Sequence, residues 1–357
     1  MVSMRKGKGR PKALNLLGIT ALSLVACSCL LKLEPNTRFG GHSQNDPLDV
    51  SPNELNTAPT ERSSLMDSAR DLNIGIREGN DIPFFWAIPK SGTSSIKSIL
   101  AKCLNLRMAS STKAIDYEEE SRNGEIRVID QGGQFVNVDF GYLRGIQQAK
   151  EWNMASSGMV DVAVSSYLHQ ALDVFTSTNS ARVFTIFRHP IQRMVSDYYY
   201  QKIATWEKTY QDEDKPLSLL EYATNSRYHV DNWVTRQIAN VHSGAVTDED
   251  FEYAKEFIRT KVLVLFLDEI DESIDRLLKY MNWRDFFDQT DEETGQQKCL
   301  DAFMHQTPSN QNEHSKIEED SEEWEALERI NYYDMKLYSY SLELFKGNQK
   351  KMIDSIQ

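Results

Sequence analysis

Residues 89–95, PKSGTSS, gather a lysine, a glycine and several hydroxyl side chains in one short turn. The turn follows the apolar run IPFFWAI (82–88), and apolar residues recur at helical spacing after it. A strand, a glycine-containing turn and a helix N-terminus form an anion site, because backbone N–H groups and the positive end of the helix dipole converge there. The sequence therefore predicts an anion-binding loop, with further donors from its polar side chains: Lys90, Thr93, Ser94 and Ser95.

This turn is not a Walker A loop. In that loop the lysine follows the second glycine of GxxxxGK[ST], whereas Lys90 precedes Gly92 here and the Walker motif occurs nowhere in the chain. A glycine-threonine pair alone is typical of an ordinary strand-to-helix turn. The lysine before the glycine and the hydroxyls after it favour a phosphate-like ligand.

A second group of anion-binding residue types lies further along the chain. The apolar run ARVFTIF (181–187) predicts a strand that ends at Arg188, and Pro190 suits the first position of the following helix. Ser196 then falls about two turns inside that helix. A single arginine after a strand often caps a helix or pairs with a carboxylate. Two such groups, each at the end of a predicted strand, fall on the sheet edge where ligands of α/β proteins bind.

Together the two motifs resemble those of the sulfotransferases. The loop of that family reads Pro-Lys-x-Gly-Thr-Ser/Thr, and its second motif reads Arg-Asp-Pro-x-x-Arg-x-x-Ser-x-Tyr. The resemblance implies that Arg188 and Ser196 bind the 3′-phosphate of 3′-phosphoadenosine 5′-phosphosulfate (PAPS), while Lys90 neutralises charge on the leaving phosphate oxygen. His189 replaces the family's aspartate, which changes local hydrogen bonding. By the same resemblance the phosphosulfate is held by the loop residues Lys90, Ser91, Gly92, Thr93, Ser94 and Ser95.

The C-terminal half is similar to the carbohydrate sulfotransferases. NWVTRQIAN (232–240) matches an Asn-x-x-x-Arg segment, which that branch places before a helix, a strand and another helix. Thr247 and Asp250 predict a capping box, and VLVLFL (262–267) predicts a buried strand. The stretch 327–345 matches the family's terminal helix. The resemblance covers about residues 81–346 and implies an α/β, P-loop-like fold with a central parallel sheet flanked by helices, and a carbohydrate acceptor.

The predicted catalytic base is His169, because an acceptor hydroxyl must lose its proton and an imidazole titrates near neutral pH. VDVAVSSY (160–167) predicts a strand, so His169 emerges at the sheet edge where ligands of α/β proteins bind. The segment also resembles the Leu-His segment of heparan sulfate 6-O-sulfotransferases, whose histidine is the base. Alternatives are a histidine that only caps its helix, or a base supplied by His189 or Asp139.

The N-terminus predicts a membrane anchor. Residues 1–12 are basic and precede ALNLLGITALSLVACSCLL (13–31), which carries no charge and is long enough to span the ~30 Å hydrocarbon core. We expect a cytoplasmic tail (1–12), a signal anchor (13–33), a flexible Pro- and Asn-rich stem (34–80) and a sulfotransferase domain (81–347) in the Golgi lumen. A cleaved signal peptide is the alternative, since small residues cluster at 26–28 and LVAC (24–27) resembles a lipoprotein box.

Charge and cysteine content narrow the functional classes. The formal charge is −13, and removing the six basic residues of 1–33 leaves 34 basic against 53 acidic residues, or −19, which argues against a nucleic-acid partner. No CxxC or HxxxH spacing suggests a metal site, and Lys90, Arg188 and backbone donors can hold the phosphosulfate without one. Cys103 lies on an apolar helix face, so we predict a free buried thiol. A bridge to Cys299 is the alternative in an oxidising lumen.

Three functions are compatible with an anion-binding loop. The first is transfer of a sulfuryl group from PAPS to a carbohydrate hydroxyl. The second is a P-loop kinase, which would need Mg²⁺ and the missing Walker motif. The third is a degenerate luminal glycan-binding protein, which would lack a cofactor ligand, whereas Lys90, Arg188 and Ser196 are all present. The sequence does not indicate an oligomeric state.

Overall fold

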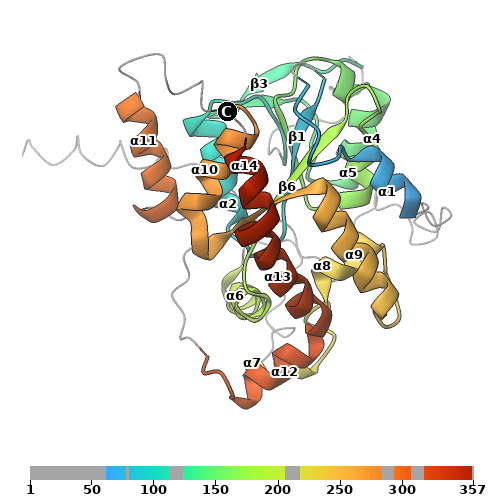
Figure 1. Ribbon diagram of the computed structural model, residues 1–357, viewed down its shortest axis with the longest axis vertical. Coiled ribbons are helices and arrows are strands. Elements are labelled where there is room, and N and C mark those ends of the chain that lie inside the picture. Colours follow the sequence, from blue (N-terminus) through green and yellow to red (C-terminus); the bar gives the residue numbers. More distant parts are fainter. Residues whose placement is uncertain are drawn as a thin grey trace, which may run out of the picture. The chain divides into compact units, whose positions relative to one another are not determined.

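A central β-sheet with helices on both faces organises the chain in the computed structural model, which describes residues 62–77, 80–111, 124–205, 218–283, 293–306 and 317–355 (Figure 1). Within these residues the sheet has the strand order β3-β4-β2-β5-β1-β6-β7, and only the β3–β4 pair is antiparallel. The α/β prediction is confirmed, with a sheet that is mostly rather than wholly parallel. The strands are β1 (Ile82–Trp86), β2 (Met108–Ala109), β3 (Val128–Asp130), β4 (Gln134–Val136), β5 (Val162–Ser165), β6 (Ala181–Phe187) and β7 (Val262–Phe266).

The central strands form because their side chains are apolar on both faces. Strands β5, β6 and β7 are buried at every position, as expected for parallel strands covered by helices on each side. Strand β1 lies between β5 and β6, with Phe84 level with Ala163 on one side and Val183 on the other. The strands predicted at 82–88, 160–167, 181–187 and 262–267 are therefore present, three of them shorter than predicted.

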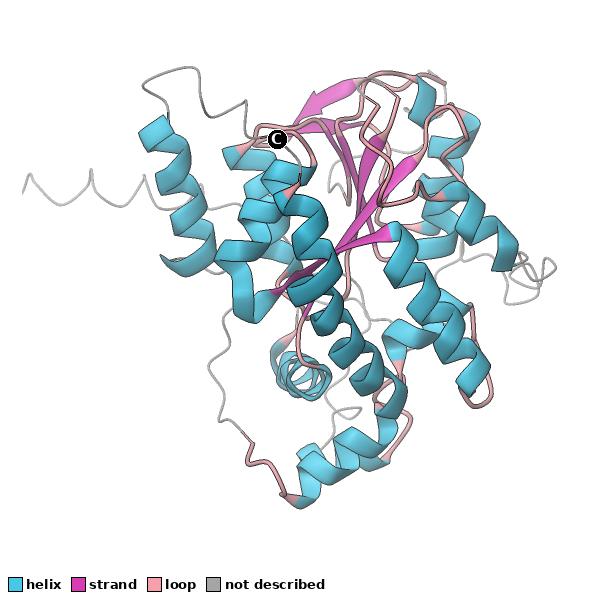
Figure 2. Cartoon of the chain, viewed as in Figure 1, coloured by secondary structure: helices cyan, strands magenta, loops and turns pink. Residues whose placement is uncertain are grey.

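Successive side chains of a strand point to opposite faces, so each face has its own core. Phe84 and Trp86 belong to one apolar cluster, which includes side chains of α1, α4, α5, α8, α9 and α13. Phe85 belongs to a second cluster, which includes side chains of α2, η1, α10 and α14. Figure 2 shows the strands running between these groups of helices. The helices on the first face are α1 (Arg62–Ser68), α4 (Leu143–Glu151), α5 (Leu168–Leu172), α8 (Trp233–Ala239), α9 (Asp248–Lys261) and α13 (Tyr332–Leu344). Those on the second are α2 (Thr93–Ser98), the π-helical η1 (Ile99–Cys103), α10 (Ile270–Tyr280) and α14 (Lys350–Asp354).

A third apolar cluster lies among α6 (Pro190–Ile203), α7 (Leu219–Thr224) and α12 (Glu322–Ile330). The remaining helical segments are α11 (Glu293–Asp301) with the π-helical η6 (Ala302–Gln306), the π-helical η7 (Phe345–Gln349), and the 3-10 turns η2 (Met154–Ser156) and η4 (Leu267–Glu269). The capping box predicted for α9 is confirmed. The Asp250 N–H donates to the Thr247 hydroxyl, and the Asp250 carboxylate accepts from the Thr247 N–H at 2.8 Å.

The folded unit begins before the predicted boundary at residue 81. Leu65 and Ala69 of the predicted stem are buried in the core, and Ala69 pairs with Ala181. The fully buried Arg182 explains why: it bonds the Asp81 carboxylate (3.0 Å) and the Asp71 carbonyl oxygen (3.1 Å). Polar contacts to one arginine fix a segment whose composition alone indicates a stem. At the other end the unit continues past residue 347 into α14, where Ile353 is buried.

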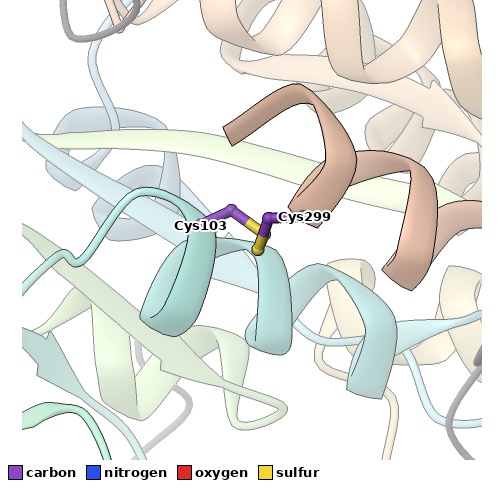
Figure 3. Close-up of a disulfide and its surroundings, with 2 residues drawn as sticks. All are labelled: Cys103 and Cys299. Atoms are coloured by element: carbon purple, nitrogen blue, oxygen red, sulfur yellow. A yellow bond between two sulfur atoms is a disulfide. The ribbon is translucent and has the colours of Figure 1, made fainter. Parts of the chain in front are cut away.

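A disulfide joins Cys103 at the end of η1 to Cys299 in α11, with a Cα–Cα distance of 5.6 Å (Figure 3). The prediction of a free Cys103 thiol is wrong. Cys103 is buried, at 4% exposure, but part of what covers it is α11. The two cysteines are 196 residues apart in sequence, so local periodicity around Cys103 held no sign of this neighbour.

The predicted tail, the anchor and residues 34–61 of the predicted stem lie outside the described residues. Within the part of the chain that is described, no helix combines the length and the apolar character needed to cross a membrane.

Candidate active site

The anion-binding loop connects β1 to α2 at the carboxyl edge of the sheet. Lys90 (φ 65°) and Gly92 (φ 84°) both adopt left-handed backbone conformations. Glycine suits position 92, because its φ is in the left-handed region and a Cβ there would lie 2.8 Å from the Leu267 side chain. A non-glycine residue with positive φ is strained, and such strain concentrates at functional sites. The loop is thus held in one unusual shape by its neighbours.

The hydroxyl groups of the loop divide into different roles. The Thr93 hydroxyl donates to the Ile88 carbonyl oxygen (2.9 Å), which closes the loop onto the end of the strand. Thr93 therefore offers a ligand its backbone N–H rather than this donor. The Ser91 hydroxyl is buried without a hydrogen-bond partner, and Ser94 and Ser95 are half-buried. Helix α2 starts at Gly92 with no side-chain cap on its first N–H groups.

The structure brings the two predicted anion motifs together. Strand β6 lies beside β1, and Arg188 at its end donates from Nη1 to the Lys90 carbonyl oxygen (3.2 Å). Burial lowers the pKa of Arg188, an effect that Asp268 opposes and Arg193 reinforces. An arginine remains charged in spite of such a shift. A cation held next to the loop backbone extends the anion site toward β6.

Helix α6 also contacts the loop. The Lys90 ammonium lies 3.8 Å from the centroid of the Tyr200 ring, a cation–π contact. Ser196 is half-buried one turn before Tyr200, and residues four apart share a helix face. The predicted 3′-phosphate ligand Ser196 is therefore on the face of α6 that meets the loop.

His189, which replaces the family's aspartate, is the N-cap residue of α6. Its ring packs against Trp324 (5.6 Å between centroids) and Tyr338 (5.3 Å). The Nδ1 atom is buried without a hydrogen-bond partner, and burial lowers the pKa of the imidazole. Aromatic packing against α12 and α13 takes the place of the hydrogen bonds that an aspartate would make.

His169, the predicted base, lies in α5 just beyond β5. That strand pairs with β1 up to the Trp86–Ser165 pair, so α5 starts at the same sheet edge as the loop. Its Nε2 lies 2.9 Å from the Gln237 carbonyl oxygen and 3.2 Å from that of Ile238. These are end carbonyls of α8, and carbonyls only accept, so Nε2 carries the proton and Nδ1 is the ring nitrogen that is able to accept one. Burial lowers the pKa of His169, which favours the neutral form.

A buried lysine in the loop helix, close to a buried carboxylate, was missed in the sequence. Lys97 is 8% exposed, its ammonium donates to the Ser111 hydroxyl (2.9 Å), and burial lowers its pKa to about 8 against the opposing effect of Asp139. Asp139, an alternative base, is 4% exposed and accepts from the Gly141 N–H (3.1 Å). Lys97 flanks the apolar face of its helix, and nothing in that pattern distinguishes it from a surface lysine.

Helix α8, which receives His169 at its C-terminus, is held at its N-terminus by α13. The buried Asp334 carboxylate accepts from the N–H groups of Val234 (3.0 Å) and Thr235 (2.9 Å) and from the Thr235 hydroxyl (2.8 Å). Arg193 of α6 lies 3.9 Å from the same carboxylate. Asp334 of the terminal helix thus positions the elements around the site.

The described residues were also compared with two other kinds of site, a metal site and a surface groove. In the described residues no group of three or more His, Cys, Asp or Glu side chains is arranged to hold a metal ion. A groove of about 810 Å³ lies between α9, α12 and α13 and contains none of the predicted site residues.

The fold and the loop define an α/β protein with a candidate anion-binding loop at the carboxyl edge of its sheet. A model of the sulfotransferase family matches residues 80–341, which include every predicted site residue. The chain belongs to the sulfotransferase family. A comparison with curated proteins gave no match.

Proposed function

We propose that the protein transfers a sulfuryl group from PAPS to a hydroxyl of a carbohydrate acceptor. The observation that carries this proposal is the contact between Arg188 and the Lys90 carbonyl oxygen, which joins the two anion motifs into one site. PAPS has one anionic group at the 3′ position and another at the 5′ position of its ribose, so it needs two anion-binding positions side by side. Transfer of the sulfuryl group itself is the established chemistry of the family.

The residues at the loop fit an anionic donor. The Ser91 hydroxyl is buried and unpaired, a state that costs free energy unless a ligand or water completes it. Helix α2 has no side-chain cap at its N-terminus, and helix N-termini favour phosphate oxygens. Lys90, Arg188 and Ser196 complete the set of proposed ligands.

The mechanism follows from charge and position. PAPS supplies the sulfuryl group, and the loop and Arg188 hold its phosphates so that the acceptor oxygen attacks in line with the departing phosphate oxygen. Lys90 neutralises charge that develops on that oxygen, and fixed donors of this kind are usually the largest single contribution to catalysis. His169 takes the acceptor proton at Nδ1. The proposal includes no metal ion, because Lys90, Arg188 and the backbone N–H groups can offset the negative charge of the donor.

Binding and transfer measured separately test this function. Calorimetry on the full chain should show adenosine 3′,5′-bisphosphate bound in preference to ATP, because Arg188 and Ser196 recognise a 3′-phosphate. Incubation with ³⁵S-labelled PAPS and a panel of glycans should label an acceptor. Preference for ATP would favour the kinase alternative, and binding of neither nucleotide would favour the degenerate glycan-binding protein.

A carbohydrate is the proposed acceptor because the resemblance extends beyond the two anion motifs to 232–240, α9, β7 and the terminal helix. The chain beyond residue 33 carries a formal charge of −19, which repels a highly sulfated acceptor at long range. A neutral or lightly sulfated glycan therefore fits the charge better. Mass spectrometry of the labelled product identifies the sugar and the hydroxyl.

We also propose that the folded unit lies in the Golgi lumen behind a single N-terminal anchor. The Cys103–Cys299 disulfide supports this, because such bonds persist in oxidising compartments and are rare in the cytosol. Protease added to intact microsomes should remove only a short cytoplasmic tail and leave the folded unit whole. Digestion of the folded unit without detergent would contradict the orientation.

A further inference from the structure

We propose that the Cys103–Cys299 disulfide positions the anion-binding loop by holding a strap, residues 293–306, against the loop helix. Reduction of the bond would then release the strap and weaken nucleotide binding while the sheet stays folded. The strap consists of α11 and η6 (Figures 1 and 3). The nucleotide part of this inference rests on the proposed function, whereas release of the strap does not.

The bridge is connected to the loop through continuous helix. Helix α2 begins directly after Gly92, passes into η1 without a break and ends at Cys103. The strap contacts both parts, with η6 next to α2 and α11 next to η1. Lys102 adds a cation–π contact to Phe303 of η6, at 5.3 Å. A covalent bond at one end of this helix therefore constrains the helix whose other end forms the anion site.

The described noncovalent contacts of the strap are few. Among its described side chains only Leu300 is buried, at 3% exposure, while Phe303 and Met304 are partly buried. The His305–Asp271 contact (2.8 Å) lies at the surface, where such pairs contribute little. The Gln296 side-chain oxygen is buried without a hydrogen-bond partner, which opposes docking. The disulfide closes a span of 196 residues, so it supplies the constraint that these contacts lack.

A dithiol can open this bond from the strap side. Cys299 is partly exposed while Cys103 is buried, so a thiolate attacks Cys299 Sγ and Cys103 leaves as a thiolate that takes up a proton. The second thiol of the reductant then displaces Cys299 and closes its own disulfide. Two electrons pass to the protein, which ends with two thiols.

The test compares the full chain with its Cys299→Ser variant, each with and without dithiothreitol. This variant changes the partly exposed cysteine and leaves Cys103 as a small buried thiol, which cores accept. Cys27 and Cys29 are present in both proteins, so any effect of dithiothreitol on them is the same in the full chain and in the variant. Lys298 is the only lysine or arginine of the strap, which makes trypsin cleavage there a direct measure of its release.

Cleavage after Lys298 should be slow in the oxidised protein and fast in the reduced protein and in the variant. The dissociation constant for adenosine 3′,5′-bisphosphate should rise roughly tenfold in both, since small displacements of positioning groups have effects of at least this size. Dithiothreitol should change nothing in the variant. Equal nucleotide affinity in oxidised and reduced protein, or equal protection of Lys298, would overturn the inference. Absence of nucleotide binding in every sample would instead count against the proposed function, and the cleavage pattern would still decide whether the strap is released.

Discussion

Replacement of Lys90 by methionine is expected to lower the turnover number by about 10²- to 10³-fold, the scale for removing one preorganised charge-stabilising group. The Lys90 ammonium sits against the Tyr200 ring, where a positive charge is partly shielded from water. Methionine keeps the unbranched side chain and the left-handed backbone strain of residue 90, so the loop conformation is preserved. The loss therefore reports the missing charge. Single-turnover transfer of ³⁵S measures it.

Nucleotide affinity separates this effect from a distorted loop. Adenosine 3′,5′-bisphosphate should bind the Lys90→Met variant with only a modest loss, because Arg188 and Ser196 still hold the 3′-phosphate. The matched control is Tyr200→Phe, which keeps the ring under the ammonium and should keep most of the activity. Turnover of the Lys90→Met variant within a few-fold of wild type would exclude Lys90 from charge stabilisation.

Replacement of His169 by alanine should reduce turnover by roughly 10²-fold or more, the usual loss for a general base. The pH profile carries a second signature. Burial lowers the pKa of His169 below its ordinary value of 6.5, so the base is unprotonated through neutral pH and kcat/KM should fall only in the acid range. That acid limb should disappear in the variant. Binding of adenosine 3′,5′-bisphosphate should remain near wild type.

The alternative role of His169 as a structural cap needs its own control, because the side chain bonds the end carbonyls of α8. His169→Gln retains an N–H donor at the position of Nε2 for those carbonyls but cannot accept a proton at neutral pH. The glutamine variant should melt close to wild type and remain as inactive as the alanine variant. Recovery of turnover with glutamine would make His169 a cap for α8 and leave the base to another residue.

The parts of the fold that depend on local pattern were predictable. Apolar runs gave β1, β5, β6 and β7, and Thr247 with Asp250 gave the capping box of α9. The loop at 89–95 was predictable too, since its residue types and its place between a strand and a helix define its chemistry. In each case the signal lies within about ten neighbouring residues.

The parts that depend on distant partners were not predictable. The end carbonyls of α8 that bind His169 lie 68 and 69 residues away in sequence, and the Cys103 partner lies 196 residues away. The sequence around Lys97 is typical of any helix lysine. Its neighbours Ser111 and Asp139 follow β2 and β4, which are distant from it in sequence. The stem prediction extended too far for the same reason, because residues 69–77 are held by the buried Arg182.

The two ends of α8 have a consequence for synthesis of the chain on the ribosome. Its C-terminal carbonyl oxygens accept from His169, which is synthesised before them. Its N-terminal N–H groups donate to Asp334, which is synthesised about a hundred residues later, 99 in the case of Thr235. The loop and its neighbouring strands can form while the chain is still growing, but the helix that orients the predicted base is secured only after α13 emerges. On the proposed function, we therefore expect a nascent or prematurely terminated chain to bind a nucleotide before it could deprotonate an acceptor, so that competence for transfer arrives with the last helices.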